Sequence, residues 1–83
     1  MKNVIKILGT GCAKCNTLAE ITAEVIREHG FDTELQKIGD IEEIMKYKVM
    51  STPALVINEK VVSSGRVPSK EEIMLFIQKE GVQ

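Results

Sequence analysis

The sequence predicts a small α/β fold with the element order strand, helix, strand, helix, strand, strand, helix. Three observations indicate this order: a short apolar run near the N-terminus gives way to a helical period, an alternating segment follows, and an apolar hairpin precedes a second helical segment. The chain has 83 residues, of which 43% are hydrophobic and 28% charged. This length supports one modest core and not two, so we expect residues 1–83 to form a single domain.

The first two predicted elements are a strand and a long helix. Residues 4–8 are apolar apart from Lys6 and end at Gly9, which fits an interior strand that leads into a tight turn. From Leu18 onward apolar residues recur at helical spacing, and Gly30 is well placed to end that helix. The apolar positions are Leu18, Ile21, Val25 and Ile26.

The next two elements are an edge strand and a short helix. Phe31, Thr33 and Leu35 alternate with the polar residues Asp32, Glu34 and Gln36, which is typical of a strand with one buried face and one face in solvent. The first helix then connects two parallel strands. A short helix follows and ends near Tyr47 or Lys48. It has a capping-box spacing at Asp40 and Glu43, and an apolar stripe of Ile41, Ile44 and Met45.

The C-terminal part reads as a hairpin and a final helix. Pro53 stands at the entry to the apolar run 54–57, and residues 58–60 separate this run from a second strand at residues 61–62. Ser69 and Glu72 have the spacing of a second capping box. The helix that they begin carries the apolar positions Ile73, Met74, Phe76 and Ile77.

Charge and hydropathy exclude several classes of partner. The formal net charge is −1 and no dense block of Lys and Arg is present, so we expect no binding to nucleic acid or to an anionic membrane. The N-terminal apolar run is interrupted by Lys6 and is too short for a signal peptide, and no apolar stretch reaches membrane-spanning length. We therefore expect a cytoplasmic protein, and we further expect it to be a monomer.

The most informative motif is the run Cys12-Ala13-Lys14-Cys15. The two thiols are three residues apart at the start of a helical pattern, so both sulfurs can lie on one face of the first turn. In the cytoplasm such a lone pair is more often catalytic or metal-binding than a permanent cross-link. A disulfide across so short a loop would stabilise the fold by only about 2 kcal/mol, so the motif favours a redox site.

Three segments together resemble the thioredoxin superfamily, and most closely its small, glutaredoxin-sized redox-active disulfide proteins. They are GTGCAKC at residues 9–15, TPALVIN at residues 52–58 and GRVPS at residues 65–69. The three segments, in this order and at this spacing, extend the resemblance over nearly the whole chain. A CxxC motif alone is weak evidence, and its combination with a Thr-Pro ahead of an apolar strand is more specific.

The resemblance implies a fold and a site. The fold is thioredoxin-like, with a four-stranded mixed sheet and helices on both faces. Cys12 is expected to be the exposed, attacking thiol and Cys15 the resolving thiol beneath it. The peptide bond before Pro53 is expected to be cis and to lie beside the sulfurs, and the backbone of Thr52 is expected to pair with the substrate peptide.

Residues around the cysteines depart from the better-known relatives and are expected to tune the site. Gly11 precedes Cys12 where thioredoxins carry a Trp, and Ala13 and Lys14 stand between the cysteines where thioredoxins have Gly-Pro. Lys6 occupies the place of the buried Asp that lies six residues before the first cysteine of thioredoxins.

The activity implied is that of a thiol-disulfide oxidoreductase that reduces disulfide-containing proteins and is recycled by a separate reductase. A thiolate is the attacking species, and both the helix N-terminus and Lys14 favour the anion at Cys12. Cys12 then forms a mixed disulfide with the substrate, and Cys15 releases the product. This chemistry needs no cofactor.

A soft-metal module that binds Cu(I) or Zn(II) through the two thiolates is the alternative. Ferredoxin-like metallochaperones also carry a CxxC loop between a strand and a helix. They place a Met shortly before the first cysteine and end on a strand, whereas Thr10 and Gly11 precede Cys12 here and the chain ends in a helical pattern. Zinc would need further ligands, and His29 is far along the helix, so we expect no metal ligands.

Four other side chains have structural explanations. His29 fits the last turn of a helix, where a partly cationic side chain is favourable. Met45 and Met74 fall on apolar helix faces and are expected to fill the core. Tyr47 either covers the site or packs at the end of its helix.

Overall fold

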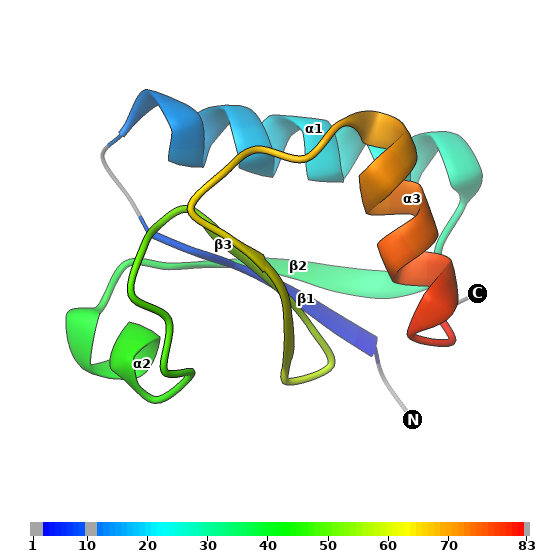
Figure 1. Ribbon diagram of the computed structural model, residues 1–83. Coiled ribbons are helices and arrows are strands. Elements are labelled where there is room, and N and C mark those ends of the chain that lie inside the picture. Colours follow the sequence, from blue (N-terminus) through cyan, green and yellow to red (C-terminus); the bar gives the residue numbers. More distant parts are fainter. Residues whose placement is uncertain (1–2, 10–11, 83) are drawn as a thin grey trace.

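The computed structural model describes residues 3–9 and 12–82, which form a four-stranded sheet with helices on both faces (Figure 1). The element order is the predicted one. The elements are β1 (Asn3–Leu8), α1 (Ala13–His29), β2 (Thr33–Ile38), α2 (Ile41–Met45), β3 (Ala54–Ile57), β4 (Lys60–Ser64) and α3 (Lys70–Lys79).

The sheet is mixed, as expected, with the strand order β2-β1-β3-β4. β1 and β2 are parallel and in register, so that Leu8 at the end of β1 lies opposite Ile38 at the end of β2. β3 runs antiparallel to both β1 and β4. β2 is an edge strand, as its alternating pattern predicted, but it begins at Thr33, because the Phe31 N–H bonds to the Ile26 carbonyl and closes the turn after α1.

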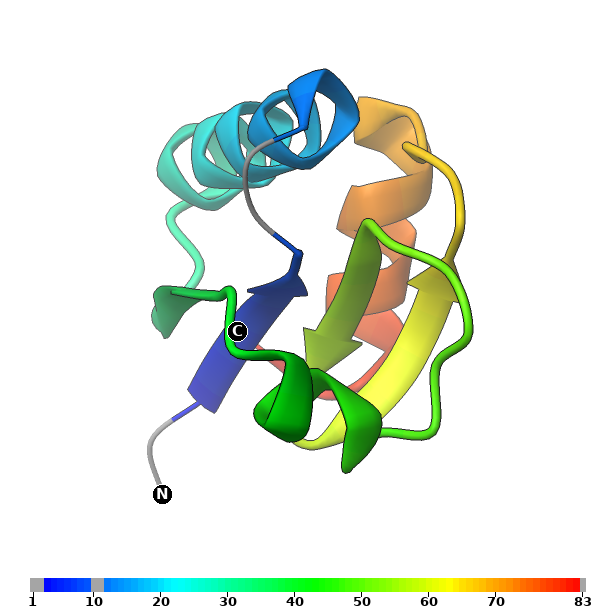
Figure 2. The same cartoon turned by 90° about the vertical axis from the view of Figure 1, so that its left-hand side faces the viewer.

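The two faces of the sheet carry different layers. α1 and α3 cover one face, and α2 lies against the other (Figures 1 and 2). The buried core under α1 and α3 contains Ile5, Ile7, Leu18, Ala19, Val25, Leu55, Ile57, Ile73, Ile77 and Val82. The face toward α2 has a smaller buried cluster of Leu8, Ala54 and Val56.

Local sequence signals set the ends of the two longer helices. Gly30 ends α1 in the left-handed region, with φ of 65°, and its N–H bonds to the Ile26 carbonyl. α3 begins with the predicted capping box, in which Ser69 and Glu72 each bond to the other's backbone N–H. These caps satisfy backbone groups that the helices themselves leave unpaired.

The start of α2 differs from the prediction. The Asp40 carboxylate accepts the N–H of Glu42 at 2.9 Å, so its cap bond goes to a different residue from the Glu43 of the expected capping box. The Glu43 carboxylate pairs with Lys46 at 3.1 Å. α2 is also shorter than expected, because the bonds that follow Met45 connect residues three apart.

The predicted apolar stripe of α2 was also wrong. Ile44 packs on the sheet, whereas Ile41 and Met45 are 71% and 66% exposed. A helix of five residues turns only one narrow side to the sheet, so the neighbouring positions stay in solvent. Met45 is therefore not core, whereas Met74 on α3 packs against the large cluster as expected.

The β3–β4 hairpin is tighter than predicted. Asn58 and Glu59 both have positive φ, 48° and 69°, and Ile57 pairs directly with Lys60. This is the conformation of a two-residue hairpin turn, and Asn is one of the residues that tolerates it. Lys60 therefore begins β4 and is not part of the loop.

None of the helices within the described ranges is both long enough and apolar enough to cross a membrane.

Candidate active site

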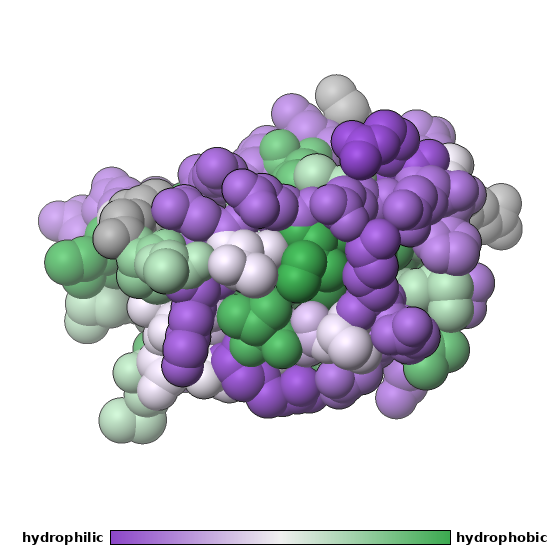
Figure 3. Space-filling view, turned by 90° about the horizontal axis from the view of Figure 1, so that it is seen from above, coloured by the Kyte–Doolittle hydropathy of each residue, from purple (hydrophilic) through white to green (hydrophobic). Residues whose placement is uncertain are grey.

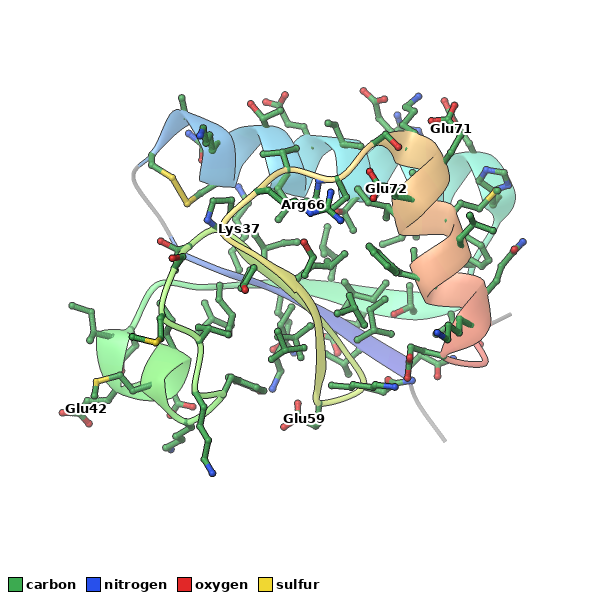
Figure 4. The ribbon with its side chains drawn as sticks, viewed as in Figure 1. Lys37, Glu42, Glu59, Arg66, Glu71 and Glu72 are labelled. Carbon is green, nitrogen blue, oxygen red and sulfur yellow. A yellow bond between two sulfur atoms is a disulfide. The ribbon has the colours of Figure 1, made fainter. Side chains whose placement is uncertain are left out.

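Cys12 and Cys15 form a disulfide at the start of α1, with their Cα atoms 5.3 Å apart (Figure 4). Cys12 is the N-cap residue, with extended backbone angles (φ −117°, ψ 154°). Its Sγ accepts the N–H of Cys15 at 3.1 Å, and its carbonyl accepts the N–H of Asn16 at 3.1 Å. The sulfur thus takes the place that a Ser or Asp oxygen has at an ordinary helix start.

The two cysteines differ in exposure. Cys15 is buried, with 3% of its surface exposed, whereas Cys12 is partly exposed. Ala13 and Lys14, which lie between them on the first turn of α1, are both exposed. A reactant can therefore approach Cys12 from solvent, while Cys15 faces the protein. Gly11, the third residue expected to tune the site, lies outside the described residues.

Gly9 fits between the disulfide and the loop that carries Thr52. Its φ is 112°, and a Cβ built there would lie 2.9 Å from Thr52 Cβ and 3.0 Å from Cys15 Sγ. Real Cβ atoms essentially never come as close as the first distance and seldom as close as the second, and L side chains rarely adopt this φ, so glycine is the residue that allows this approach. Gly9 was predicted from the sequence only as the end of a strand. Its position three residues before Cys12 was the one signal in the sequence that could have placed it at the site.

The predicted Thr52–Pro53 segment lies beside the disulfide, because Thr52 and Cys15 both approach Gly9 closely. The peptide bond between the two residues is cis. Pro53 is buried, Thr52 is exposed, and the Pro53 carbonyl accepts the N–H of Gly65 at 2.9 Å. Gly65 has a φ of 75°, and a Cβ there would lie 3.2 Å from Ser51 Cβ.

Gly65 was not predicted as a site residue. Its N–H and its lack of a side chain let the start of the loop after β4 lie against the Thr52–Pro53 segment. The structure thus brings together four of the residues proposed from the sequence, Cys12, Cys15, Thr52 and Pro53, and adds the two glycines that hold their backbones close.

Lys6 takes part in a polar cluster on the α2 face of the sheet. Its Nζ donates to the Tyr47 hydroxyl at 2.7 Å and to the Glu59 carboxylate at 2.8 Å. Tyr47 in turn donates to Glu59 at 3.1 Å. The hydrogen bonds that Lys6 donates, first to Glu59 and then to Tyr47, raise the pKa of Lys6 above its usual range, and the bond from Lys6 lowers the pKa of Glu59.

This cluster decides between the two alternatives for Tyr47. The Tyr47 ring packs against the small apolar cluster of the sheet just after α2, and its hydroxyl is bonded to Lys6 and Glu59. Tyr47 therefore packs at the end of its helix.

Metal ligands are not grouped in the part of the chain that the structure describes. Within residues 3–9 and 12–82, no three His, Cys, Asp or Glu side chains lie close enough together to hold an ion. His29 is at the last residue of α1, as expected, and its ring centroid lies 5.6 Å from that of Phe31. The soft-metal alternative gains no support from this arrangement.

Comparison with known proteins gives a matching family model and two related thioredoxins. A family model described as thioredoxin domain matches residues 3–78. A thioredoxin of Methanocaldococcus jannaschii is 41% identical over 70 residues, which cover 84% of this chain and 80% of the relative. A thioredoxin of Methanothermobacter thermautotrophicus is 39% identical over 69 residues, which cover 83% and 90% of the two chains.

Solved structures support the same fold at much lower identity. A malarial protein superposes with a TM-score of 0.75 at 16% identity, covering 99% of this chain and all of that one. Thioredoxin f2 of Chlamydomonas reinhardtii gives 0.68 at 15% identity, covering 96% of this chain and 80% of its own. The family model matches most of the chain, two thioredoxins are about 40% identical to it, and the structure has a disulfide at the start of α1. The chain therefore belongs to the thioredoxin family and is a thiol-disulfide oxidoreductase.

Proposed function

We propose that the protein reduces disulfide bonds of other proteins, with Cys12 as the attacking and Cys15 as the resolving thiol. One observation carries this assignment: Cys12 is partly exposed and its sulfur accepts a backbone N–H at the start of a helix, whereas Cys15 is 3% exposed. The attacking thiol must reach a substrate, and the resolving thiol needs to reach only its neighbour.

The reaction consists of two exchanges. The Cys12 thiolate attacks one sulfur of the substrate disulfide, a Cys12–substrate bond forms, and the other substrate sulfur leaves and takes up a proton. Cys15 then loses its proton and attacks Cys12 Sγ, which releases the second substrate sulfur as a thiol. Two electrons pass to the substrate, and the protein is left with the Cys12–Cys15 disulfide. A separate reductase returns the two electrons.

The start of α1 stabilises the attacking thiolate. The N–H of Cys15 points at Cys12 Sγ, and the unpaired N–H groups of the first turn add about half a positive charge near that sulfur. Lys14 is exposed in the same turn and contributes a further cation. A thiolate held in this way is available at neutral pH. Gly11 and Ala13 are the other residues that we assign to tuning this environment.

Substrate binding is assigned to Thr52 and Pro53. The Gly9 contact places this segment against the disulfide, and the Gly65 N–H holds the Pro53 carbonyl. An extended substrate peptide that pairs with the Thr52 backbone would therefore present its own disulfide to Cys12. We further propose that residues 1–83 act as a single domain, because one continuous sheet supports both the buried core and α1, which begins at the cysteines. We also propose that the protein is a cytoplasmic monomer, as expected from the sequence.

Reduction of insulin with dithiothreitol as electron donor tests the assignment. Cys12→Ser should reduce turnover to the uncatalysed rate, because the attacking sulfur is gone. Cys15→Ser should instead accumulate a covalent mixed disulfide through Cys12, visible by mass spectrometry. Thermal melts of both variants serve as the folding control. Wild-type turnover in Cys12→Ser, or a trapped complex through Cys15, would show that the roles are wrong.

A further inference from the structure

The loop after β4 lies against the Thr52–Pro53 segment and carries an arginine, Arg66. The Gly65 N–H donates to the Pro53 carbonyl at 2.9 Å, and a Cβ at Gly65 would lie 3.2 Å from Ser51 Cβ. Arg66 is the next residue, so its backbone is one residue away from this contact. In Figures 1 and 2 the loop begins beside the chain that enters β3, at the end of the sheet where α1 starts.

The Arg66 side chain is held in place by Glu72 of α3. Its Nη1 and Nη2 atoms donate to the two carboxylate oxygens of Glu72 at 3.3 and 2.9 Å, so the pair is bidentate. Glu72 is fixed in turn, because its carboxylate also accepts the N–H of Ser69 in the capping box. Figure 4 shows the two side chains together between the loop and the start of α3. Two parallel bonds to a helix start hold the guanidinium in one orientation.

The guanidinium of Arg66 still has donors for a second acceptor. An arginine has five N–H groups, and two of them bond to Glu72, so three have no partner among residues 3–9 and 12–82. The side chain of Arg66 is also 52% exposed. Because its planar fork matches the geometry of a carboxylate, a second carboxylate can bind at its outer edge without displacing Glu72.

The segments around the disulfide and Pro53 carry positive charge. Residues 12–17, 51–53 and 64–67 contain two charged side chains, Lys14 and Arg66, and both are cations. Lys14 is exposed in the first turn of α1. The face of the molecule on the α1 side is mostly hydrophilic, as Figure 3 shows. A polypeptide that approaches Cys12 therefore meets cations and hydrogen-bond donors on both of these segments.

We propose that Arg66 selects polypeptide substrates that carry an acidic side chain within a few residues of the cysteine that Cys12 attacks. The three remaining N–H groups of Arg66 bind that carboxylate while the substrate backbone pairs with Thr52, and Lys14 adds a favourable charge. The proposal rests on the proposed function, because it names the class of substrate for the same site. Arg66 is a specificity-determining residue that takes no part in the exchange of sulfur bonds.

Single-turnover kinetics with symmetric peptide disulfides test the proposal. Each peptide carries one cysteine and, at one position within four residues of it, either Glu or the neutral Gln. The fully reduced protein is mixed with each disulfide, and released peptide thiol is quantified after acid quench. Wild-type protein should react with the best Glu peptide about fivefold faster than with its Gln counterpart, and added NaCl should reduce this ratio, as for an exposed ion pair.

Arg66→Gln should remove most of this preference, because a neutral amide replaces the cationic fork. Arg27→Gln is the matched control. It removes the same charge from an exposed arginine, but Arg27 lies in the last turn of α1, at the far end of that helix from the cysteines, so the wild-type preference should remain (Figure 1). The ratio of the Glu and Gln rates is the readout, so a variant that slows both reactions equally does not imitate the effect. Thermal melts check that both variants are folded.

Hydroxyethyl disulfide, which is small and neutral, separates the role of Arg66 from the proposed function. If wild-type protein failed to reduce it, the proposed function itself would be contradicted. Reduction of this compound without a preference for any Glu peptide would overturn only the role of Arg66. An equal loss of preference in Arg66→Gln and Arg27→Gln would assign the effect to net charge, and a preference that persists in Arg66→Gln would assign it to another cation such as Lys14. Either result overturns the proposal.

Discussion

On one face of the sheet, α1 and α3 enclose a continuous buried core, whereas on the other the five-residue α2 covers only a small cluster and leaves two of its three apolar side chains in solvent. Burial of apolar area is the main source of stability, so the α1–α3 face supplies most of it. The α2 face combines a few apolar contacts with the Lys6–Tyr47–Glu59 cluster. The comparison indicates that the two faces contribute unequally to stability, and that the disulfide stands at the start of the helix on the more stable face.

A pair of truncations should show the largest contrast between the faces. Ile73 on α3 is fully buried, so Ile73→Ala should lower the free energy of unfolding by about 3–4 kcal/mol. Ile44 on α2 is only partly buried, so Ile44→Ala should cost about 1–2 kcal/mol. Urea unfolding followed by circular dichroism measures both. Equal losses would mean that α2 contributes as much to the core as α3 does.

A substitution at the junction of the faces should have the next largest effect. Gly9→Ala would place a Cβ against Thr52 and Cys15 at a backbone angle that favours glycine, and should cost about 2–3 kcal/mol. It should also slow insulin reduction, because the Thr52 segment must move away from the sulfurs. Gly30→Ala, where a Cβ would meet nothing within 4 Å, is the control for positive φ alone. Similar activity in the two variants would contradict the role of close approach.

The polar cluster of the α2 face should contribute less. Tyr47→Phe keeps the ring and removes the hydroxyl that joins Lys6 to Glu59, so the loss should be about 1 kcal/mol. Because the ring still packs on the sheet, hydroxyethyl disulfide should be reduced at the wild-type rate. If Tyr47→Phe lowered the free energy of unfolding as much as Ile73→Ala, the polar cluster, and not burial, would be what holds α2 against the sheet.

Acid pH should produce the smallest difference. The bond from Lys6 lowers the pKa of Glu59, and the bond from Lys70 lowers the pKa of Glu24 on the α1–α3 side. A glutamate whose folded pKa is lowered stabilises the fold above its unfolded pKa, and this contribution disappears as the pH falls through the folded value. Glu59→Gln and Glu24→Gln should therefore each reduce stability at pH 7 and reduce it less at pH 3.

Both glutamates are exposed, so salt should weaken these effects. Melting temperatures at pH 7 and pH 3, with and without added NaCl, measure them. A pH-independent loss on either substitution would show that packing, and not charge, is responsible.

The sequence predicted the element order and most of the residues that lie together around the disulfide, because those features depend on local signals. The spacing of apolar residues, the helix-capping residues and the turn residues mark α1, β2 and α3. Ser69 and Glu72 form the capping box that their spacing indicated. Cys12, Cys15, Thr52 and Pro53 were found through motifs. For these residues the local pattern and the final environment agree.

The misses share a physical cause. Met45 has a helical apolar spacing, but whether it is buried depends on how far α2 extends over the sheet, which its own pattern does not contain. Gly9 and Gly65 are needed because Thr52, Cys15, Ser51 and Pro53 approach them from distant parts of the chain. Such contacts exist only after folding, so a single sequence shows a glycine without showing its reason.

The crowding at Gly9 also limits how this sequence can vary over time. A side chain at position 9 would meet Thr52 on one side and the sulfur of Cys15 on the other, and the sulfur cannot be exchanged without loss of the redox pair. A smaller residue at position 52 would relieve neither the contact with this sulfur nor the strain of a side chain at a φ of 112°. Position 9 should therefore stay glycine across descendants of this protein for as long as they keep the cysteine pair.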